Sequence, residues 1–337
     1  MKALVYIGPK QVEVRDMDLP PKKENELLVK VKYCGVCGSD QGIFLGTHPR
    51  AKAPLILGHE VLGEVLEDED DFKKGDRVVT YPLISCGKCL PCRTGNEHVC
   101  NTLKLIGIDQ DGGMREKMYL DKETVFKVPE EVSDKVAVTV EPLAVLLRAI
   151  HQSEFKTQDT AVVMGAGPIG LLAGIVLKYS GASKVFISDI IDERLETAKK
   201  LGLIPVNSSK EDLVEIVKEH TDGEGADCLI ECSGAEAAAM QMTQVVRVGG
   251  GIVMASVHKH PHAVNLQQLN FKEQWLIGSR VYTKEEFKQA VDLLTKLSDD
   301  LERVVTHVVP LSEADKVFEL INTPSEGTAK VIVDCQR

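Results

Sequence analysis

TAVVMGAGPIG, residues 160–170, is the stretch that decides the fold of this 337-residue chain. Residues 160–164 have the composition of a buried strand, and the glycine-rich turn after them opens an apolar segment with helical spacing. Gly165 permits a tight turn, Gly167 lets a pyrophosphate approach the backbone, and Gly170 lets helix and strand pack closely. The N–H groups at the start of such a helix attract negative charge. We therefore predict a dinucleotide site at Gly165, Gly167, Pro168, Ile169 and Gly170.

An acidic residue follows at the end of the next predicted strand, residues 184–188. Asp189 lies 19 residues beyond Gly170, where a carboxylate accepts hydrogen bonds from both ribose hydroxyls and repels a 2′-phosphate. This favours NAD over NADP as the cofactor. Arg194 is a candidate to flank the adenine, although an arginine in a first helical turn is as often a surface residue. A glycine turn that binds nothing is the alternative, and the strand, helix and acid together argue against it.

Strand and helix patterns continue to alternate as far as residue 277, which predicts a parallel, doubly wound sheet. The first third of the chain instead reads as short β-rich segments separated by turn residues, which predicts a barrel-like domain. The tail has an amphipathic helix followed by two strand-like segments, and we expect it to return to the first domain. The predicted fold class is α/β, with a nucleotide-binding domain at 147–281 and a first domain made of 1–146 and 282–337.

Composition narrows the class of protein. A length of 337 residues, 43% hydrophobic and 27% charged residues are typical of a two-domain globular protein. The net charge of −11, without a long Lys/Arg run, argues against a nucleic-acid partner. No stretch resembles a signal peptide or approaches about 18 uninterrupted apolar residues, so we expect a cytoplasmic protein without a membrane partner.

Nine cysteines in a chain without a secretory signal favour metal ligation or burial over a disulfide framework. Cys86, Cys89 and Cys92 are followed after seven residues by Cys100, so residues 84–102 supply four thiolates from one short lobe. A closed site of four cysteines has no open coordination position, and its zinc would only organise the loop. Two disulfides or an iron–sulfur cluster are the alternatives.

A second group of candidate ligands comes from three separated segments. Cys37, the pair His59-Glu60 and Glu141 provide the cysteine, histidine and carboxylate that an open catalytic zinc site requires. Each residue taken alone is weak evidence, because a lone histidine is more often a core or surface residue. Adjacent residues of a strand point to opposite faces, which makes ligation by both His59 and Glu60 awkward if their segment is extended. Either Glu60 or Glu141 therefore remains a candidate for the third ligand.

The motifs are CGSD at 37–40, GHE at 58–60, GDRV at 75–78, the four-cysteine lobe, EPLA at 141–144 and the glycine-rich turn. In this order they resemble the zinc-containing medium-chain dehydrogenase/reductase family, and the resemblance runs essentially from end to end. It implies a GroES-like β-barrel catalytic domain, a Rossmann NAD-binding domain and two zinc ions per chain, one catalytic and one structural. It also implies a homodimer or homotetramer, with the strand near residues 275–281 as the contact.

Within that family, Glu141 in place of a cysteine is similar to the sorbitol, threonine and sugar-acid dehydrogenase branch. The stretch from LGTHP, residues 45–49, up to GHE, residues 58–60, is most similar to hexonate and polyol dehydrogenases such as the L-idonate and L-galactonate 5-dehydrogenases. The chain departs from the pattern at Gly42, where the family often has a histidine, and at Phe44, where a tyrosine is common. Ser39 remains as the first member of a proton relay. The proton then leaves through the cofactor ribose and water, or through His48 as the alternative.

We therefore expect a zinc-dependent, NAD-linked oxidoreductase that oxidises a secondary alcohol of a small polyol or sugar acid to a ketone. The predicted catalytic residues are Cys37, Ser39, His59, Glu60 and Glu141. Further candidates for substrate contact are Phe44, His48, Arg280 and Tyr282. Alternatively, Arg280 and Tyr282 belong to an interface between subunits. Threonine or 2,3-butanediol is the alternative substrate. A zinc-ribbon interaction protein with a vestigial nucleotide fold is the non-enzymatic alternative.

Overall fold

The computed structural model describes residues 1–322 and 328–337. These residues form two compact units, each described here by itself. Unit 1 contains Met1–Glu141, the described part of Thr283–Pro324 and Lys330–Arg337, and unit 2 contains Pro142–Tyr282.

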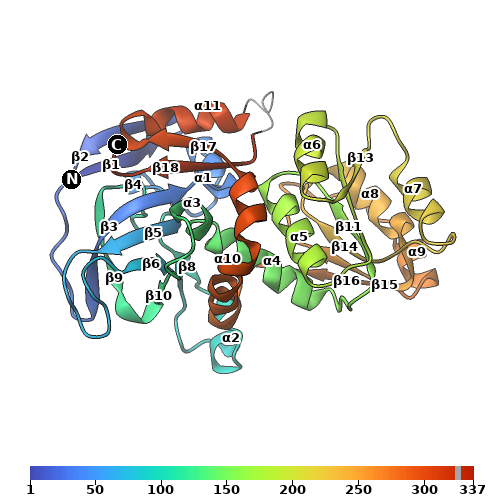
Figure 1. The fold of residues 1–337 in the computed structure, drawn as a ribbon, viewed down its shortest axis with the longest axis horizontal. Helices are drawn as coiled ribbons and strands as arrows, with labels where there is room; N and C mark the ends of the chain where they lie inside the picture. Colours follow the sequence, from blue (N-terminus) through green and yellow to red (C-terminus); the bar gives the residue numbers. More distant parts are fainter. Residues whose placement is uncertain (323–327) are drawn as a thin grey trace. The chain divides into compact units, whose positions relative to one another are not determined.

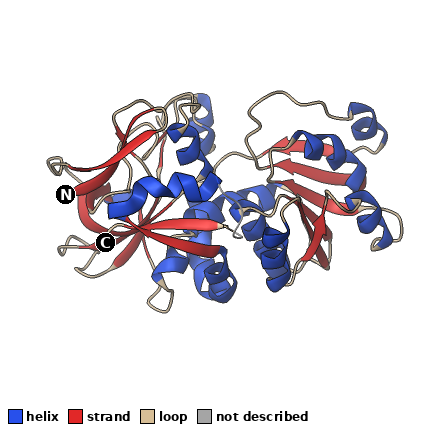
Figure 2. Cartoon of the chain, turned by 90° about the horizontal axis from the view of Figure 1, so that it is seen from above, coloured by secondary structure: helices blue, strands red, loops and turns tan. Residues whose placement is uncertain are grey.

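Unit 2 is built on a six-stranded parallel sheet in the order β13-β12-β11-β14-β15-β16, with helices on both faces (Figures 1 and 2). Its strands are β11 (Thr160–Met164), β12 (Lys184–Asp189), β13 (Ile204–Asn207), β14 (Ala226–Glu231), β15 (Val246–Met254) and β16 (Trp275–Gly278). Its helices are α5 (Pro168–Tyr179), α6 (Asp192–Lys200), α7 (Leu213–Glu219), α8 (Glu236–Val245) and α9 (Leu266–Phe271). The chain also forms α4 (Val140–Gln152), which begins at the end of unit 1.

The sequence of β11 explains its central position in this sheet. All five of its residues are buried, as the apolar run at 160–164 predicts for a strand covered on both faces. The strand order reverses between β11 and β14, and in such sheets ligands bind beyond the carboxyl ends of the strands at this point. The predicted doubly wound α/β sheet is confirmed.

The glycines at 249–251 lie inside a strand rather than ahead of it. We predicted that they lead into a strand at 252–255, whereas β15 already begins at Val246. A β-carbon added at Gly251 would stand 2.1 Å from the ring of Trp275 on β16. The glycine therefore lets the tryptophan lie against the neighbouring strand, a close approach that the local pattern does not reveal.

Unit 1 contains a seven-stranded sheet along the path β10-β6-β5-β3-β18-β17, with β9 paired to β3, and a three-stranded sheet in the order β2-β1-β4. The strands of these sheets are β1 (Lys2–Gly8), β2 (Gln11–Asp16), β3 (Glu26–Gly35), β4 (Leu55–Ile56), β5 (Glu60–Val65), β6 (Arg77–Thr80), β9 (Lys117–Asp121), β10 (Val125–Lys127), β17 (Val305–Pro310) and β18 (Lys330–Asp334). A small hairpin pairs β7 (Leu83–Ile84) with β8 (Lys104–Leu105). Its helices are α1 (Gly38–Phe44), α2 (Leu90–Arg93), α3 (Asp134–Ala137), α10 (Lys284–Val304) and α11 (Val317–Asn322), with 3-10 turns at Glu97–Val99, Lys122–Thr124 and Leu311–Lys316.

The tail returns to the first unit, as the sequence predicts. Strand β18 pairs with β3 in antiparallel register, with Val333 opposite Cys34. Before it, α10 begins at a capping box formed by Thr283 and Glu286. The four apolar residues that predict this helix are all buried in it: Phe287, Ala290, Val291 and Leu294.

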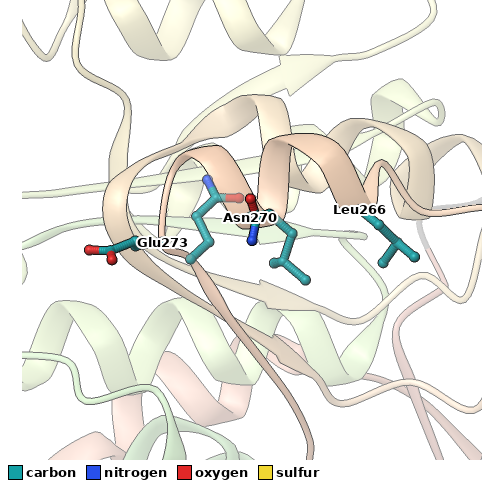
Figure 3. A pocket seen from close by; sticks show the side chains of 5 residues that line it. Leu266, Asn270 and Glu273 are labelled. Carbon is teal, nitrogen blue, oxygen red and sulfur yellow. The ribbon is translucent and has the colours of Figure 1, made fainter.

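An open surface pocket of about 610 Å³ lies beside α9, at the end of the sheet that carries β16 (Figure 3). Leu266, Asn270 and Glu273 line it together with Leu269 and Gln274, and none of the predicted site residues does so. Among the residues that the structure describes, no helix combines the length and the apolar character needed to cross a bilayer.

Candidate functional site

The first candidate ligand, Cys37, lies between the end of β3 and the start of α1. It is the residue that precedes the helix, and its backbone N–H donates a 2.8 Å hydrogen bond to Asp40 Oδ2. The other oxygen of Asp40 accepts a hydrogen bond from the backbone N–H of Gly58 at 3.3 Å. The fully buried Asp40 carboxylate therefore links the segment of Cys37 to the segment that carries His59.

The structure brings Cys37, His59 and Glu60 together. One potential ligand atom from each lies within 4.8 Å of the others. The objection to ligation by both His59 and Glu60 holds only for an extended segment, and it does not apply here, because β5 begins only at Glu60 and His59 belongs to the loop before it. That loop turns at Gly58, whose φ of +93° favours glycine.

Glu141, the alternative third ligand, lies outside this group of three. It is nevertheless close enough to raise the pKa of His59 through its charge. The geometry thus favours Glu60 over Glu141 as the carboxylate beside Cys37 and His59.

Burial and charge define the surroundings of His59. Burial alone would lower its pKa, but the hydrogen-bonded Cys37 and the charges of Asp40, Cys37 and Glu141 outweigh burial, and the pKa is raised well above its ordinary value. Among the described residues, His59 Nδ1 has no hydrogen-bond partner, and Asp40 Oδ1 lies 3.9 Å from it. A buried imidazole with an unpartnered nitrogen beside a thiol and a carboxylate is a donor set that fits zinc.

Glu60 forms a buried ion pair with Lys330. Lys330 Nζ of β18 donates hydrogen bonds to Glu60 Oε1 at 2.5 Å and to the backbone carbonyl of Val36 at 3.0 Å. Burial would lower the pKa of Lys330, but the Glu60 carboxylate outweighs burial and raises it. The sequence analysis missed Lys330, since no local pattern pairs residue 330 with residue 60.

Ser39, the predicted start of a proton relay, has a buried hydroxyl without a hydrogen-bond partner among the described residues. His48 is half-buried, and its Nδ1 accepts hydrogen bonds from the backbone N–H groups of Arg50 and Ala51 at 3.4 and 3.2 Å. Burial and then the charge of Arg50 lower the pKa of His48. The hydrogen of its neutral ring is therefore on Nε2.

The remaining predicted substrate contacts have other surroundings. Phe44 stacks on Phe318 of α11, with ring centroids 4.3 Å apart and planes 3° from parallel. Tyr282 is fully buried, whereas Arg280 is exposed. These positions identify a packing role for Phe44 and do not place Arg280 and Tyr282 in a common site.

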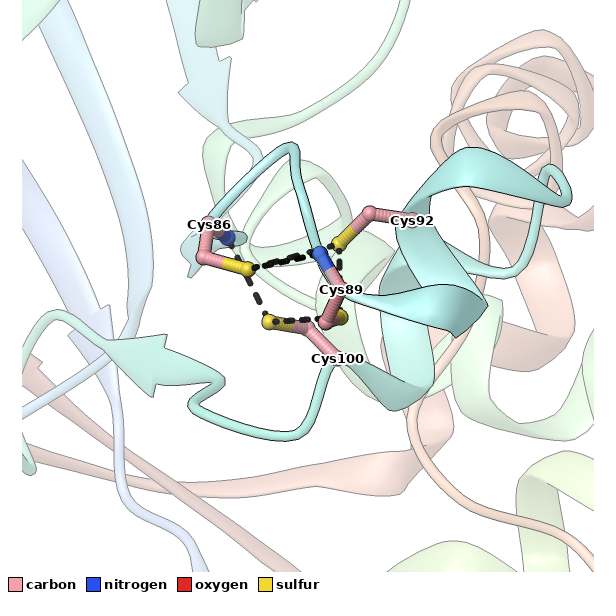
Figure 4. A group of neighbouring side chains, drawn as sticks. All are labelled: Cys86, Cys89, Cys92 and Cys100. Carbon is pink, nitrogen blue, oxygen red and sulfur yellow. Dashed lines mark hydrogen bonds between the residues drawn. The ribbon is translucent and has the colours of Figure 1, made fainter.

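The four cysteines of the lobe point their sulfur atoms at one another (Figure 4). Cys89 Sγ lies 3.4 Å from Cys92 Sγ and 3.8 Å from Cys100 Sγ, and Cys86 Sγ lies 4.0 Å from Cys92 Sγ. A tetrahedral zinc with Zn–S bonds of about 2.3 Å separates its sulfur ligands by about 3.8 Å, so this arrangement fits a zinc ion. All nine cysteines lie in the described part of the chain, and none forms a disulfide.

Backbone N–H groups favour the thiolate form of two of the four cysteines, whereas burial raises the pKa of Cys92 to about 12. The N–H groups of Lys88 and Cys89 donate to Cys86 and lower the pKa of its thiol to about 6. The N–H groups of Cys86 and Thr102 donate to Cys100 Sγ at 3.3 and 3.4 Å, and its pKa is also lowered. Because metal binding requires deprotonated sulfur, these contacts favour the ligand form.

In unit 2, the glycine-rich turn joins β11 to α5 as predicted. Gly165 has a φ of +101°, and a β-carbon at Gly170 would stand 1.7 Å from the carbonyl oxygen of Gly165. Gly167 precedes the helix without a side-chain cap, and the space where its β-carbon would stand is open. The helix N-terminus is thus accessible to an anion such as a pyrophosphate.

Asp189 ends β12 beside this turn. Its Oδ2 accepts a 2.8 Å hydrogen bond from the N–H of Ala166, and its Oδ1 accepts hydrogen bonds from Ile190 and Ile191. Arg194 Nη1 lies 3.6 Å from Oδ2. The carboxylate is therefore held against the glycine-rich turn, and Arg194 is its ion-pair partner rather than an isolated surface residue.

Another group at the carboxyl end of β14 was missed by the sequence analysis. Glu231 is fully buried, accepts hydrogen bonds from the N–H groups of Ser233 and Gly234 at 2.8 and 2.9 Å, and lies 3.1 Å from His258 Nε2. A β-carbon at Gly165 would stand 3.1 Å from the backbone of Ser233, so this segment lies beside the glycine-rich turn. The available signal was the position of these residues after a strand at the reversal of strand order.

Comparison with known proteins identifies the family of this chain. Residues 23–130 match the alcohol dehydrogenase GroES-like domain, and residues 168–296 match the zinc-binding dehydrogenase domain. The chain is 35% identical to 2-dehydro-3-deoxy-L-galactonate 5-dehydrogenase of Pseudoalteromonas atlantica, over 99% of both chains.

Solved structures give the same result. A zinc-binding dehydrogenase from Sinorhizobium meliloti 1021, bound to NADP, superimposes with a TM-score of 0.93 at 30% identity, over 99% of this chain and 98% of that one. A short chain alcohol dehydrogenase from Escherichia coli CFT073, complexed with NADH, has a TM-score of 0.91 at 30% identity, over 99% of both chains. The chain therefore belongs to the zinc-containing medium-chain alcohol dehydrogenase family.

Proposed function

We propose that this chain is a zinc-dependent dehydrogenase that uses NAD to oxidise a secondary alcohol of a sugar acid or polyol to a ketone. The observation that carries the proposal is the convergence of Cys37, His59 and Glu60 within 4.8 Å of one another. A cysteine, a histidine and a carboxylate are three protein ligands that leave room for a substrate oxygen. When bound, zinc acts as a Lewis acid toward that oxygen and NAD accepts a hydride.

The residues around the ligands keep them in place and receive the proton. Asp40 is hydrogen bonded to the backbone of both Cys37 and Gly58, and so fixes the distance between the two ligand-bearing segments. The buried hydroxyl of Ser39 has no partner among the described residues, which leaves it able to accept a hydrogen bond from a substrate hydroxyl. We assign the first proton transfer to Ser39, with the neutral ring of His48 as the alternative.

The acidic side chain beside the glycine-rich turn supports NAD over NADP. Asp189 places a carboxylate at the end of β12, and the 2′-phosphate of NADP would meet like charge there. Arg194 is 3.6 Å from this carboxylate and partly offsets its charge. Since one similar structure holds NADP and another NADH, both cofactors belong in the test.

Likeness to a sugar-acid dehydrogenase along the whole chain supports the substrate class. The test is a set of steady-state assays with hexonates, polyols, L-threonine and 2,3-butanediol, each with NAD and with NADP. We expect kcat/KM to be at least about tenfold higher for a hexonate or polyol than for threonine or the diol, a difference of about 1.4 kcal/mol in transition-state binding. A preference for threonine or the diol would overturn the proposed substrate class, but not the proposed zinc-dependent oxidation of a secondary alcohol by NAD.

The metal centre is tested by Cys37→Ser. We expect the variant to lose turnover by about 10³-fold or more, since the Lewis acid supplies several kcal/mol, while NAD binding stays measurable by fluorescence. Cys34→Ala is the matched control, because Cys34 is a fully buried cysteine three residues away and outside the ligand group. Full turnover in a Cys37→Ser protein that lacks bound metal would contradict the proposal.

We also propose that the chain forms a homodimer or homotetramer through unit 2. Strand β16 is an edge of the six-stranded sheet, and its Leu276 and Ile277 are exposed. An unprotected apolar edge strand is a surface on which a second copy can pair.

A further inference from the structure

The loop after β15 carries three histidines within five residues, His258, His260 and His262, in the run HKHPH. None of the three is a proposed zinc ligand or a residue of the glycine-rich turn. The rings of His258 and His262 lie together, with centroids 5.2 Å apart and planes at 70°, whereas His260 is exposed. Two of the three imidazoles therefore form a pair that the spacing in the sequence does not specify.

The two ring nitrogens of His258 have different surroundings. Nε2 lies 3.1 Å from Glu231 Oε2, and because a carboxylate only accepts hydrogen bonds, Nε2 carries the hydrogen of this one. Nδ1 is buried and has no hydrogen-bond partner among the described residues. A buried polar atom without a partner requires an explanation, and a bound ion is one of the few that apply.

Glu231 holds the ring of His258 in a fixed orientation. Its side chain is fully buried. Its Oε1 accepts hydrogen bonds from the backbone N–H groups of Ser233 and Gly234 at 2.8 and 2.9 Å, and its Oε2 accepts one from the hydroxyl of Ser256. Histidines that bind metals commonly donate their second ring N–H to a carboxylate in this way, which fixes the ring and makes the free nitrogen a better ligand. Glu231 and His258 thus have the arrangement of a carboxylate–histidine–metal triad.

The separation of the two rings fits a shared ion. A Zn²⁺ ion lies about 2.0–2.1 Å from an imidazole nitrogen and hence about 3.2 Å from the ring centre, so a tetrahedral angle between two such ligands separates the ring centres by about 5 Å. The centroids of His258 and His262 are 5.2 Å apart. His262 makes no hydrogen bond among the described residues, so either of its ring nitrogens is available as a ligand.

We propose that His258 Nδ1 and His262 form a third metal site, for a divalent transition-metal ion such as Zn²⁺, with water in the remaining coordination positions. Imidazole ligands are typical of such ions, whereas Mg²⁺ and Ca²⁺ prefer oxygen. This site consists of residues of unit 2, whereas both groups of ligands described above belong to unit 1. It does not depend on the proposed dehydrogenase activity. An ion at this site links the loop after β15 to Glu231 at the carboxyl end of β14.

The test is a calorimetric titration of the full-length protein with Zn²⁺, after the two sites of unit 1 have been filled. We expect one further equivalent to bind. His258→Gln keeps an amide N–H for Glu231 and removes Nδ1, and His262→Gln leaves the contact with Glu231 unchanged, so each should abolish this binding. His260→Gln is the matched control, because His260 is an exposed histidine of the same loop, and it should bind the additional Zn²⁺ as the unmodified protein does.

A second measurement identifies the ligands in the unmodified protein. Diethyl pyrocarbonate modifies free imidazole nitrogens, so Zn²⁺ should protect His258 and His262 from it, but not His260, as mass spectrometry of the peptides measures. Absence of the further equivalent, or its retention in His262→Gln, would overturn the proposal. Equal loss in His260→Gln would also overturn it, because the loop would then capture zinc without a defined site. Since neither measurement uses turnover, failure of this site leaves the proposed dehydrogenase function untouched.

Discussion

At the scale of single residues, the position of Glu60 at the metal centre depends on a glycine, Gly35. Gly35 ends β3, and the Glu60 carboxylate occupies the space that a β-carbon at residue 35 would need. Three atoms of Glu60, including its own β-carbon at 3.0 Å, lie at or within the closest distances that a β-carbon tolerates. A methyl group there must therefore move Glu60 as a whole and not only the end of a flexible side chain.

We predict that Gly35→Ala displaces Glu60 and lowers both the zinc content of the catalytic centre and kcat. Overpacking of this kind costs about 1–3 kcal/mol of unfolding free energy, which urea denaturation measures. Gly38→Ala is the matched control, because no atom lies within 4 Å of its added β-carbon, and it should change stability by less than about 0.5 kcal/mol. A Gly35→Ala protein with the metal content and turnover of the parent would show that Glu60 is not held as described.

At the scale of elements, the four-cysteine lobe has almost no core of its own. Helix α2 buries none of its residues, and the neighbouring hairpin β7–β8 has only two residue pairs. So small a segment cannot offset its conformational entropy by apolar burial. The sulfur cluster must therefore supply the stability of the lobe, through the ion that it binds.

We predict that a chelator that removes this ion opens the lobe and leaves the two units folded. Trypsin should then cleave after Lys88 and Arg93 at least about tenfold faster, because proteolysis follows the population of the opened state. Mass spectrometry of the fragments identifies the sites. Cys100→Ser should reproduce the cleavage without chelator, and equal protection with and without the ion would contradict a structural role for the metal.

At the scale of the whole molecule, the proposed oligomer depends on the exposed edge of the sheet in unit 2. Leu276 and Ile277 are 38% and 37% exposed on the last strand, and Phe271 at the end of α9 is 76% exposed. Leu266 and Leu269 of α9 line the open pocket shown in Figure 3. Exposed apolar side chains on an edge strand are a surface on which a second copy can pair.

We predict that Leu276→Glu lowers the mass of the particle in solution, as light scattering after gel filtration measures it. A carboxylate on the edge strand places like charges opposite each other in a symmetric contact, which costs several kcal/mol. Tyr179→Glu, at the end of α5, changes an exposed residue of the same unit away from that edge and should leave the mass unchanged. An unchanged mass for Leu276→Glu would remove β16 as the interface.

The sequence by itself determined what depends on local spacing. The run 160–170 predicts a strand, a glycine turn and a helix. The positive φ of Gly165 and its close contact with Gly170 involve only residues that are near each other in the sequence. The spacing of Cys86, Cys89 and Cys92 likewise places three sulfur atoms in one loop. Apolar periodicity predicted α10 from its buried face.

Only the tertiary structure decided which distant residues meet. The choice of Glu60 over Glu141 depends on where β5 begins, and the partnership of Lys330 with Glu60 depends on β18 pairing with β3 across about 300 residues of chain. Local patterns carry no information on such pairings, because a buried lysine and an exposed one look the same in the sequence. The packing of the strands is what turns Lys330 toward the carboxylate.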